Sequence, residues 1–112
     1  MLREDKALHP FWFEEAAEAP GAGRIGLTEA FLESVEEEIV GLELARAGDR
    51  VRAGETFGFL HTHRRSLDLR APRSLRIRSI NAAAVADARL VRQSPYGRGW
   101  LAEVEWDEGS QF

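Results

Sequence analysis

The stretch that decides the fold runs from His61 to Pro72 and has the sequence HTHRRSLDLRAP. The segment FGFL precedes it, and the run LDLRA forms much of its second half. Apolar and polar residues alternate in both segments, which predicts a β-hairpin with Arg64 and Arg65 near its tip. A tight two-residue turn favours Asn or Gly because it needs positive φ angles. We therefore expect the two arginines to lie in a wider turn based on type I geometry.

The chain before this hairpin contains strands and one short helix. Residues 11–13 (FWF) begin a strand, and these adjacent aromatic side chains either anchor the segment to the core or form an exposed contact surface. Thr28 is a favourable N-cap for a helix that starts at Glu29. Carboxylates oppose the helix dipole at a C-terminus, so the acidic run 36–38 (EEE) predicts the end of this helix near Glu36. The same run is either a solvated face or a docking patch for a basic partner.

The remaining pattern is that of many short strands with few helices. Alternation predicts strands at 39–44, 75–78 and 100–106. Glycine and proline predict turns at 16–23, 46–49 and 95–99. Short helical pieces are expected after Asn81, which can cap the first of them, and over 87–93. The fold class is therefore mostly β with short helices, in a small sandwich or barrel. The alternation assigns these side chains to the core: Leu44, Val51, Phe57, Phe59, Ile77, Leu101 and Val104.

The composition is that of a soluble globular domain. The chain has 112 residues, of which 44% are hydrophobic and 30% charged, and this length corresponds to one domain. We expect a loosely held lead-in over 1–10, the domain over 11–107 and a tail over 108–112. No apolar run is long enough to cross a membrane. The absence of cysteine fits a cytoplasmic location, and the net charge of −4 argues against a nucleic-acid partner.

Several segments of the chain, taken in order, resemble the glycine cleavage system H proteins. The segment GDRVRAGE at 48–55, followed by TFG, resembles the strand-turn-strand of this family. SLDLRAP at 66–72 resembles the family's return strand, and PYGRGWL at 95–101 is similar to its C-terminal signature. The likeness covers about Trp12 to Trp106. It implies the barrel-sandwich hybrid fold of lipoyl and biotinyl carrier domains, with a helix near the N-terminus.

The resemblance also implies a chemistry that this hairpin lacks. In the family, a lysine four residues before the aspartate matched by Asp68 carries lipoate, which shuttles an aminomethyl group between the other glycine cleavage enzymes. That position is Arg64 here, and His61 replaces the acidic residue usually found three positions before the lysine. A neutral amine is a nucleophile, whereas a guanidinium stays protonated at physiological pH and does not form the amide. Lys6 is the only lysine and lies outside any predicted hairpin, so no lipoate and no other cofactor is expected.

The hairpin supplies all the candidate site residues, and their predicted role is to bind a partner. His61 and His63 share a strand face, but no cysteine or carboxylate nearby completes a metal site, so no metal is expected. The forked donors of Arg64 and Arg65 suit a phosphate, a carboxylate or an acidic protein surface. The alternatives are a solvated tip, or an ion pair between one of these arginines and Asp68. No Ser-His-Asp order and no glycine-rich phosphate loop is present, so the chain is not expected to be an enzyme.

Two functions from different classes remain open. The first is a non-lipoylated H-protein homologue that acts as a binding or regulatory module, with glycine cleavage or lipoate-handling enzymes as candidate protein partners. The second is a carrier component of the glycine cleavage system whose role does not need the tip lysine, or that carries another group. The mass of the intact protein separates them, because an unmodified chain favours the first.

Overall fold

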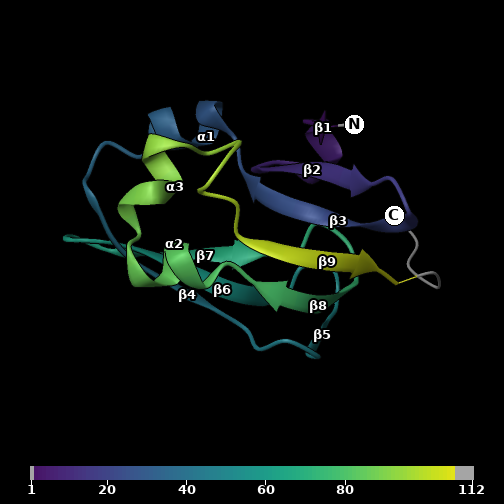
Figure 1. Cartoon of the computed structure of the whole chain (residues 1–112). Helices are drawn as coiled ribbons and strands as arrows, with labels where there is room; N and C mark the ends of the chain where they lie inside the picture. Colours follow the sequence, from purple (N-terminus) through teal and green to yellow (C-terminus); the bar gives the residue numbers. More distant parts are fainter. Residues whose placement is uncertain (1, 108–112) are drawn as a thin grey trace.

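Two antiparallel sheets form the framework of the chain in a computed structural model that describes residues 2–107 (Figure 1). Within this range the larger sheet has the strand order β1-β2-β3-β9-β8-β5, and the smaller has the order β4-β6-β7. The strands are β1 (Leu2–Arg3), β2 (Phe11–Ala16), β3 (Ala19–Leu27), β4 (Ile39–Leu44), β5 (Arg50–Val51), β6 (Thr56–Thr62), β7 (Ser66–Arg70), β8 (Leu75–Ile80) and β9 (Ala102–Trp106). The helices are the short 3-10 helix η1 (Lys6–Leu8) and the α-helices α1 (Glu29–Ser34), α2 (Ala82–Ala86) and α3 (Arg89–Gln93). None of these helices is long and apolar enough to span a bilayer. The mostly β fold class with short helices is confirmed, and the predicted tail over 108–112 lies outside the described residues.

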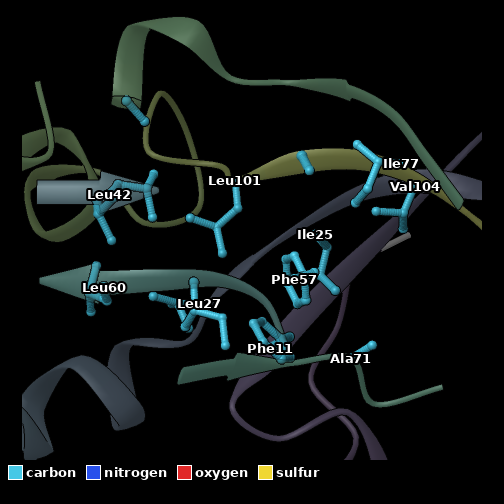
Figure 2. Packing of buried hydrophobic residues seen from close by; sticks show 14 of the residues in the cluster. Phe11, Ile25, Leu27, Leu42, Phe57, Leu60, Ala71, Ile77, Leu101 and Val104 are labelled. Carbon is cyan, nitrogen blue, oxygen red and sulfur yellow. The ribbon is translucent and has the colours of Figure 1, made fainter. Parts of the chain in front are cut away.

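The hydrophobic core draws side chains from both sheets. Leu42 and Leu60 enter it from the smaller sheet, and Ile25 and Leu27 enter it from β3 of the larger sheet (Figure 2). Burial of each such side chain stabilises the fold by about 1.5–3 kcal/mol. Residues 11–13 are also buried, which confirms their predicted anchoring role. The predicted core is confirmed for the buried Val51, Phe57, Ile77, Leu101 and Val104, and for the partly buried Leu44.

The core assignment of Phe59 is wrong, because a β-bulge changes the face of β6. The pairing with β7 passes over one extra residue of β6 between Thr56 and Gly58. A shift of one residue reverses the alternation, so Phe57 is 2% exposed whereas Phe59 is 37% exposed. A Cβ atom at Gly58 would lie 2.5 Å from the carbonyl oxygen of Glu43. Glycine at this position therefore permits the close approach of β4.

Of the two predicted helix caps, at Thr28 and Asn81, only the first is formed. The Thr28 hydroxyl accepts a hydrogen bond from the amide nitrogen of Phe31 (3.2 Å), which confirms the predicted N-cap of α1. Asn81 precedes α2, but its side chain makes no capping hydrogen bond. Its amide nitrogen donates instead to the carbonyl oxygens of Arg98 (2.8 Å) and Trp100 (2.7 Å). Asn81 thus holds the glycine-rich loop before β9 against the start of α2.

Two expectations for the first thirty residues are wrong. β1 pairs with β2, and Leu8 is buried in the core, so the lead-in is not loosely held over residues 2–8. The predicted turn over 16–23 is too long, because residues 19–23, with Pro20 and Gly21, belong to β3. The chain reverses at residues 17–18 instead. The β2–β3 ribbon is therefore longer than the sequence pattern indicates.

Candidate functional site

The hairpin tip is a three-residue connection organised by Thr62. β6 ends at Thr62 and β7 begins at Ser66, so residues 63–65 join the strands. The Thr62 amide donates to the carbonyl oxygen of Arg65 (2.8 Å). The Thr62 hydroxyl oxygen accepts from the amides of Arg64 (3.2 Å) and Arg65 (3.1 Å). No non-glycine residue in the described range has a positive φ, which agrees with a turn wider than the two-residue type. The tip projects at the left of Figure 1.

The Arg65 side chain contacts the acidic run rather than solvent alone. Its Nε lies 2.6 Å from Oε1 of Glu37, and its Nη2 lies 3.3 Å from Oε2 of the same residue. This is the forked geometry in which guanidinium and carboxylate form their strongest pairs. The Glu37 side chain is only 15% exposed, whereas Glu36 and Glu38 are exposed. Glu37 is thus neither a solvated residue nor a docking group, and Arg65 is not a free cation.

Arg92 of α3 fixes the segment that presents Glu37. Its Nη1 donates to the carbonyl oxygen of Leu32 (2.9 Å). Its Nη2 donates to the carbonyl oxygens of Val35 (2.7 Å) and Glu37 (3.2 Å). These carbonyls lie in and just after the last turn of α1, where backbone carbonyls run short of helical partners; that of Leu32 also accepts from the amide of Val35 (3.1 Å). Arg92 therefore connects α3 to the acidic run through hydrogen bonds. Glu37 of that run in turn connects α3 to the hairpin tip through its ion pair with Arg65.

The ion pair changes the acidity of Glu37. The hydrogen bond from Arg65 is the main cause that lowers the pKa of Glu37 below the usual 4.5, with a smaller contribution from a hydrogen bond to the Glu37 backbone. A carboxyl group whose pKa is lowered in the folded state stabilises the fold above its unfolded pKa. That contribution is lost as the pH falls through the folded-state pKa.

Glu37→Gln is therefore expected to destabilise the protein at neutral pH and much less at acid pH. The melting-temperature difference between the two proteins should be largest near pH 7 and should shrink as the pH falls through the folded-state pKa of Glu37, which lies below 4.5 and where the wild-type carboxyl is also neutralised. The check is a pH series of thermal denaturation, with Glu38→Gln as the exposed control from the same run. A difference that stays constant with pH would show that the Arg65–Glu37 pair is not its cause.

A second set of contacts lies on the outer face of the smaller sheet. The ring of His61 on β6 has its Nε2 2.5 Å from Oε1 of Glu43 on β4, and its Nδ1 2.6 Å from Oγ of Ser66 on β7. The ring of Phe59 stacks on the His61 ring, with centroids 6.2 Å apart and planes 15° apart. The bulge at Gly58 places these two rings on the outer face. A hydrogen-bonded row therefore crosses all three strands of this sheet.

The other predicted site residues do not meet in one place. His63 and Arg64 are exposed at the tip, and the Arg64 guanidinium forms no hydrogen bond or ion pair with any of residues 2–107. Asp68 does not pair with a tip arginine, so that alternative is wrong. Its Oδ2 lies 3.7 Å from Nη2 of Arg70 and 3.4 Å from the hydroxyl of Thr56. In the described part of the chain, no three His, Cys, Asp or Glu side chains form a group that could hold a metal.

The contacts of four residues in the site region were not predicted from the sequence. Glu43 and Ser66 lie opposite β6 residues on neighbouring strands, so a strand register would have placed them near His61. Glu37 and Arg92 have no comparable signal, because their contacts join segments that are 28 and 55 residues apart in the chain. Only the folded structure brings them together.

Comparisons with known proteins give one consistent result. The family model described as "Glycine cleavage H-protein" matches residues 3–112. The glycine cleavage system H protein of Corynebacterium jeikeium is 35% identical over 102 residues, which are 90% of this chain and 80% of that protein. Those of Thermobifida fusca and Carboxydothermus hydrogenoformans are 38% identical over 88 residues and 36% identical over 83 residues. The aligned parts are 79% and 74% of this chain, and 69% and 63% of the two relatives.

The structure is similar to a solved protein of the same kind. The crystal structure of a glycine cleavage system H protein from Mycobacterium marinum superposes with a TM-score of 0.74 and 34% sequence identity. The match covers 86% of this chain and 77% of the other. It confirms the barrel-sandwich hybrid fold that the resemblance implied. The chain belongs to the glycine cleavage H-protein family.

Proposed function

We propose that this chain is an H-protein-like module that does not carry lipoate and that acts by binding protein partners. The family normally carries lipoate on a lysine and interacts with the glycine cleavage enzymes. Those enzymes, and enzymes that handle lipoate, are therefore the partners we propose. The family assignment supports a role as a non-enzymatic component. We propose a cytoplasmic location for the protein. The proposal includes no nucleic-acid partner and no membrane partner.

The observation that carries the proposal is the absence of a lysine from the β6–β7 hairpin. Motif spacing matches Arg64 to the family's lipoyl-lysine, and Arg64 lies at the exposed tip. The only lysine of the chain is Lys6, in the short helix η1 that follows β1. Figure 1 shows β1 at the opposite side of the molecule from the hairpin tip. A guanidinium at the tip keeps its proton and is not acylated to an amide.

The tip instead offers one free cation on an acidic body. Arg64 is exposed, whereas Arg65 is engaged by Glu37. The chain as a whole has a net charge of −4. A local positive charge of this kind speeds association with an acidic partner more than it adds affinity. Its effect should be weakened by salt, because the Debye length is ~10 Å at 0.1 M.

Arg64→Glu is expected to slow association with the partner at least about tenfold at low salt. The partner is first identified by a pull-down from the native organism, with glycine cleavage and lipoate-handling enzymes as the candidates. The thermal stability of the variant should stay close to wild type, because the Arg64 side chain has no direct partner to lose. Rates are measured by surface plasmon resonance over a salt series.

Two variants separate the tip from general charge effects. Arg78→Glu changes the same charge at an exposed site of β8 in the larger sheet, and should leave the association rate near wild type. Arg65→Glu should lower stability as well as binding, because it sets two carboxylates against each other at Glu37. Association that is unchanged in Arg64→Glu and insensitive to salt would mean that the tip is not the contact.

A carrier role that does not use a tip lysine is the second candidate function. It is favoured if the protein isolated from its native organism carries a covalent group. The intact mass of that protein decides between the two, since the binding module should have the mass of the unmodified chain.

A further inference from the structure

The row of side chains across the smaller sheet has the connectivity of a nucleophile, a base and an orienting carboxylate. Ser66 contributes the hydroxyl, His61 the imidazole and Glu43 the carboxylate, from three neighbouring strands. The two heavy-atom distances, 2.6 Å and 2.5 Å, are both within hydrogen-bonding range. A nucleophile bonded to a base that is oriented by a third group is the recurring signature of an activated hydroxyl.

The chemistry of the three groups fixes the direction of the hydrogen bonds. An ionised carboxylate only accepts hydrogen bonds, so the proton of a neutral His61 ring lies on Nε2, facing Glu43. Nδ1 then carries the lone pair, and the Ser66 hydroxyl must donate to it. This is the tautomer in which a histidine can remove the proton of a serine. The carboxylate of Glu43 positions the ring and stabilises the positive charge that forms on it.

The His61 ring is also held in place by its neighbours. Gly41 on β4 lies opposite His61, and a Cβ atom there would come 3.4 Å from both Cβ and Cδ2 of the histidine. These are van der Waals distances, so the ring packs closely over the backbone of β4 at Gly41. Phe59 stacks against the ring as a further support. A base held by packing and hydrogen bonds keeps the geometry that proton transfer requires.

We propose that Ser66 is an acceptor for an acyl group supplied by an activated ester or thioester. Ser66 Oγ forms a bond to the acyl carbon while its proton moves to Nδ1 of His61. The bond between the acyl carbon and the leaving oxygen or sulfur breaks, and the leaving group takes the proton from His61. The product is an oxygen ester on β7, with no change in oxidation state. This site does not depend on the missing lysine, because it forms an ester rather than an amide.

The structure favours a stoichiometric modification over catalytic turnover. Ser66 is exposed and lies on β7, which is an edge strand of its sheet. An acyl donor can therefore reach it from solvent. The amides of Arg64 and Arg65 already donate to the Thr62 hydroxyl, so they do not form an oxyanion hole beside Ser66. An activated donor needs this stabilisation less than the stable oxygen ester does, so acylation of Ser66 is favoured over hydrolysis of the product.

The test is acetylation of the full chain by p-nitrophenyl acetate at neutral pH, followed by intact-mass analysis and peptide mapping. Ser66 should be acetylated faster than the exposed Ser34 of α1, whose hydroxyl bonds a backbone carbonyl and has no base beside it. Alkaline hydroxylamine should remove the acetyl ester from Ser66 but not acetyl amides from Lys6 or the N-terminus. Ser66→Ala should abolish the hydroxylamine-sensitive product at this hairpin.

Matched histidine variants test the base. His61→Asn should slow acetylation of Ser66 at least about tenfold, because general base catalysis is typically worth about 10²–10⁴. His63→Asn, which changes a histidine at the exposed tip of the same hairpin, should leave the rate within about twofold of wild type. Glu43→Gln should slow the reaction and also change the nitrogen NMR shifts of His61, since an amide no longer enforces one tautomer.

The outcomes are distinct. The proposal is overturned if Ser66 reacts no faster than Ser34, or if His61→Asn acetylates as fast as wild type. Neither result would affect the proposed lack of lipoylation, which concerns a hydroxylamine-resistant amide on the hairpin. A lipoyl amide would overturn that function and leave the Ser66 ester untouched.

Discussion

Replacing Phe57 with alanine is expected to destabilise the protein by about 3–5 kcal/mol, the usual cost of removing a buried aromatic ring. Phe57 is 2% exposed, and its ring packs on that of Phe11 with centroids 5.5 Å apart. Figure 2 shows the two rings together within the core cluster, Phe11 from β2 and Phe57 from β6. A domain of this size has only about 5–15 kcal/mol of total stability. The variant should therefore be close to the limit of folding.

Phe59→Ala is the matched control, on the same strand and with the same change of side chain. Because Phe59 lies on the outer face, its loss should cost less than about 1 kcal/mol, as is usual for surface substitutions. Urea denaturation of the two variants and the wild type gives both values. Equal costs, or a larger cost for Phe59, would mean that the bulge at Gly58 is not where the structure has it.

Much of the fold followed from local pattern. The cap at Thr28, the strand over 39–44 and the hairpin over 57–71 were all predicted, because each depends on residues close in sequence. The exposure of Phe59 on the outer face of the smaller sheet was not predicted. A bulge is a change of register between strands, and strict alternation assumes that no such change occurs. The close approach of β4 to Gly58 is visible only once the strands are paired.

In the candidate site, even more of the structure depends on contacts between residues far apart in the sequence. The sequence indicated two exposed arginines at the tip, and Arg64 fits that description. Arg65 is exposed as well but is not free, because Glu37 lies beside it in the fold and 28 residues away in the chain. The link from Arg92 to Glu37 spans 55 residues. Ion pairs of this kind depend on which loops meet, and no local spacing rule predicts them.

Co-expression with a lipoate ligase and lipoate is expected to leave this chain without a lipoyl group. The tip presents a guanidinium at the position matched to the acceptor lysine, and the one amine side chain lies in η1. Arg64→Lys should gain a lipoyl group in part, since it restores the amine on an unchanged turn. The gain is expected to be incomplete, because His61 remains where the family usually has an acidic residue.

The controls test the few side chains that could accept an acyl group, and the activity of the ligase. Lys6→Arg removes the last lysine and should behave as wild type if Lys6 is not an acceptor. An H protein that is lipoylated under the same conditions shows that the ligase is active. Treatment with alkaline hydroxylamine distinguishes an amide from an ester on Ser66.

The most direct measurement is the intact mass of the wild-type chain after this co-expression and hydroxylamine treatment. The account predicts the mass of the unmodified chain, alongside a lipoyl increment on Arg64→Lys. A lipoyl or octanoyl increment on the wild-type chain that resists hydroxylamine would contradict it.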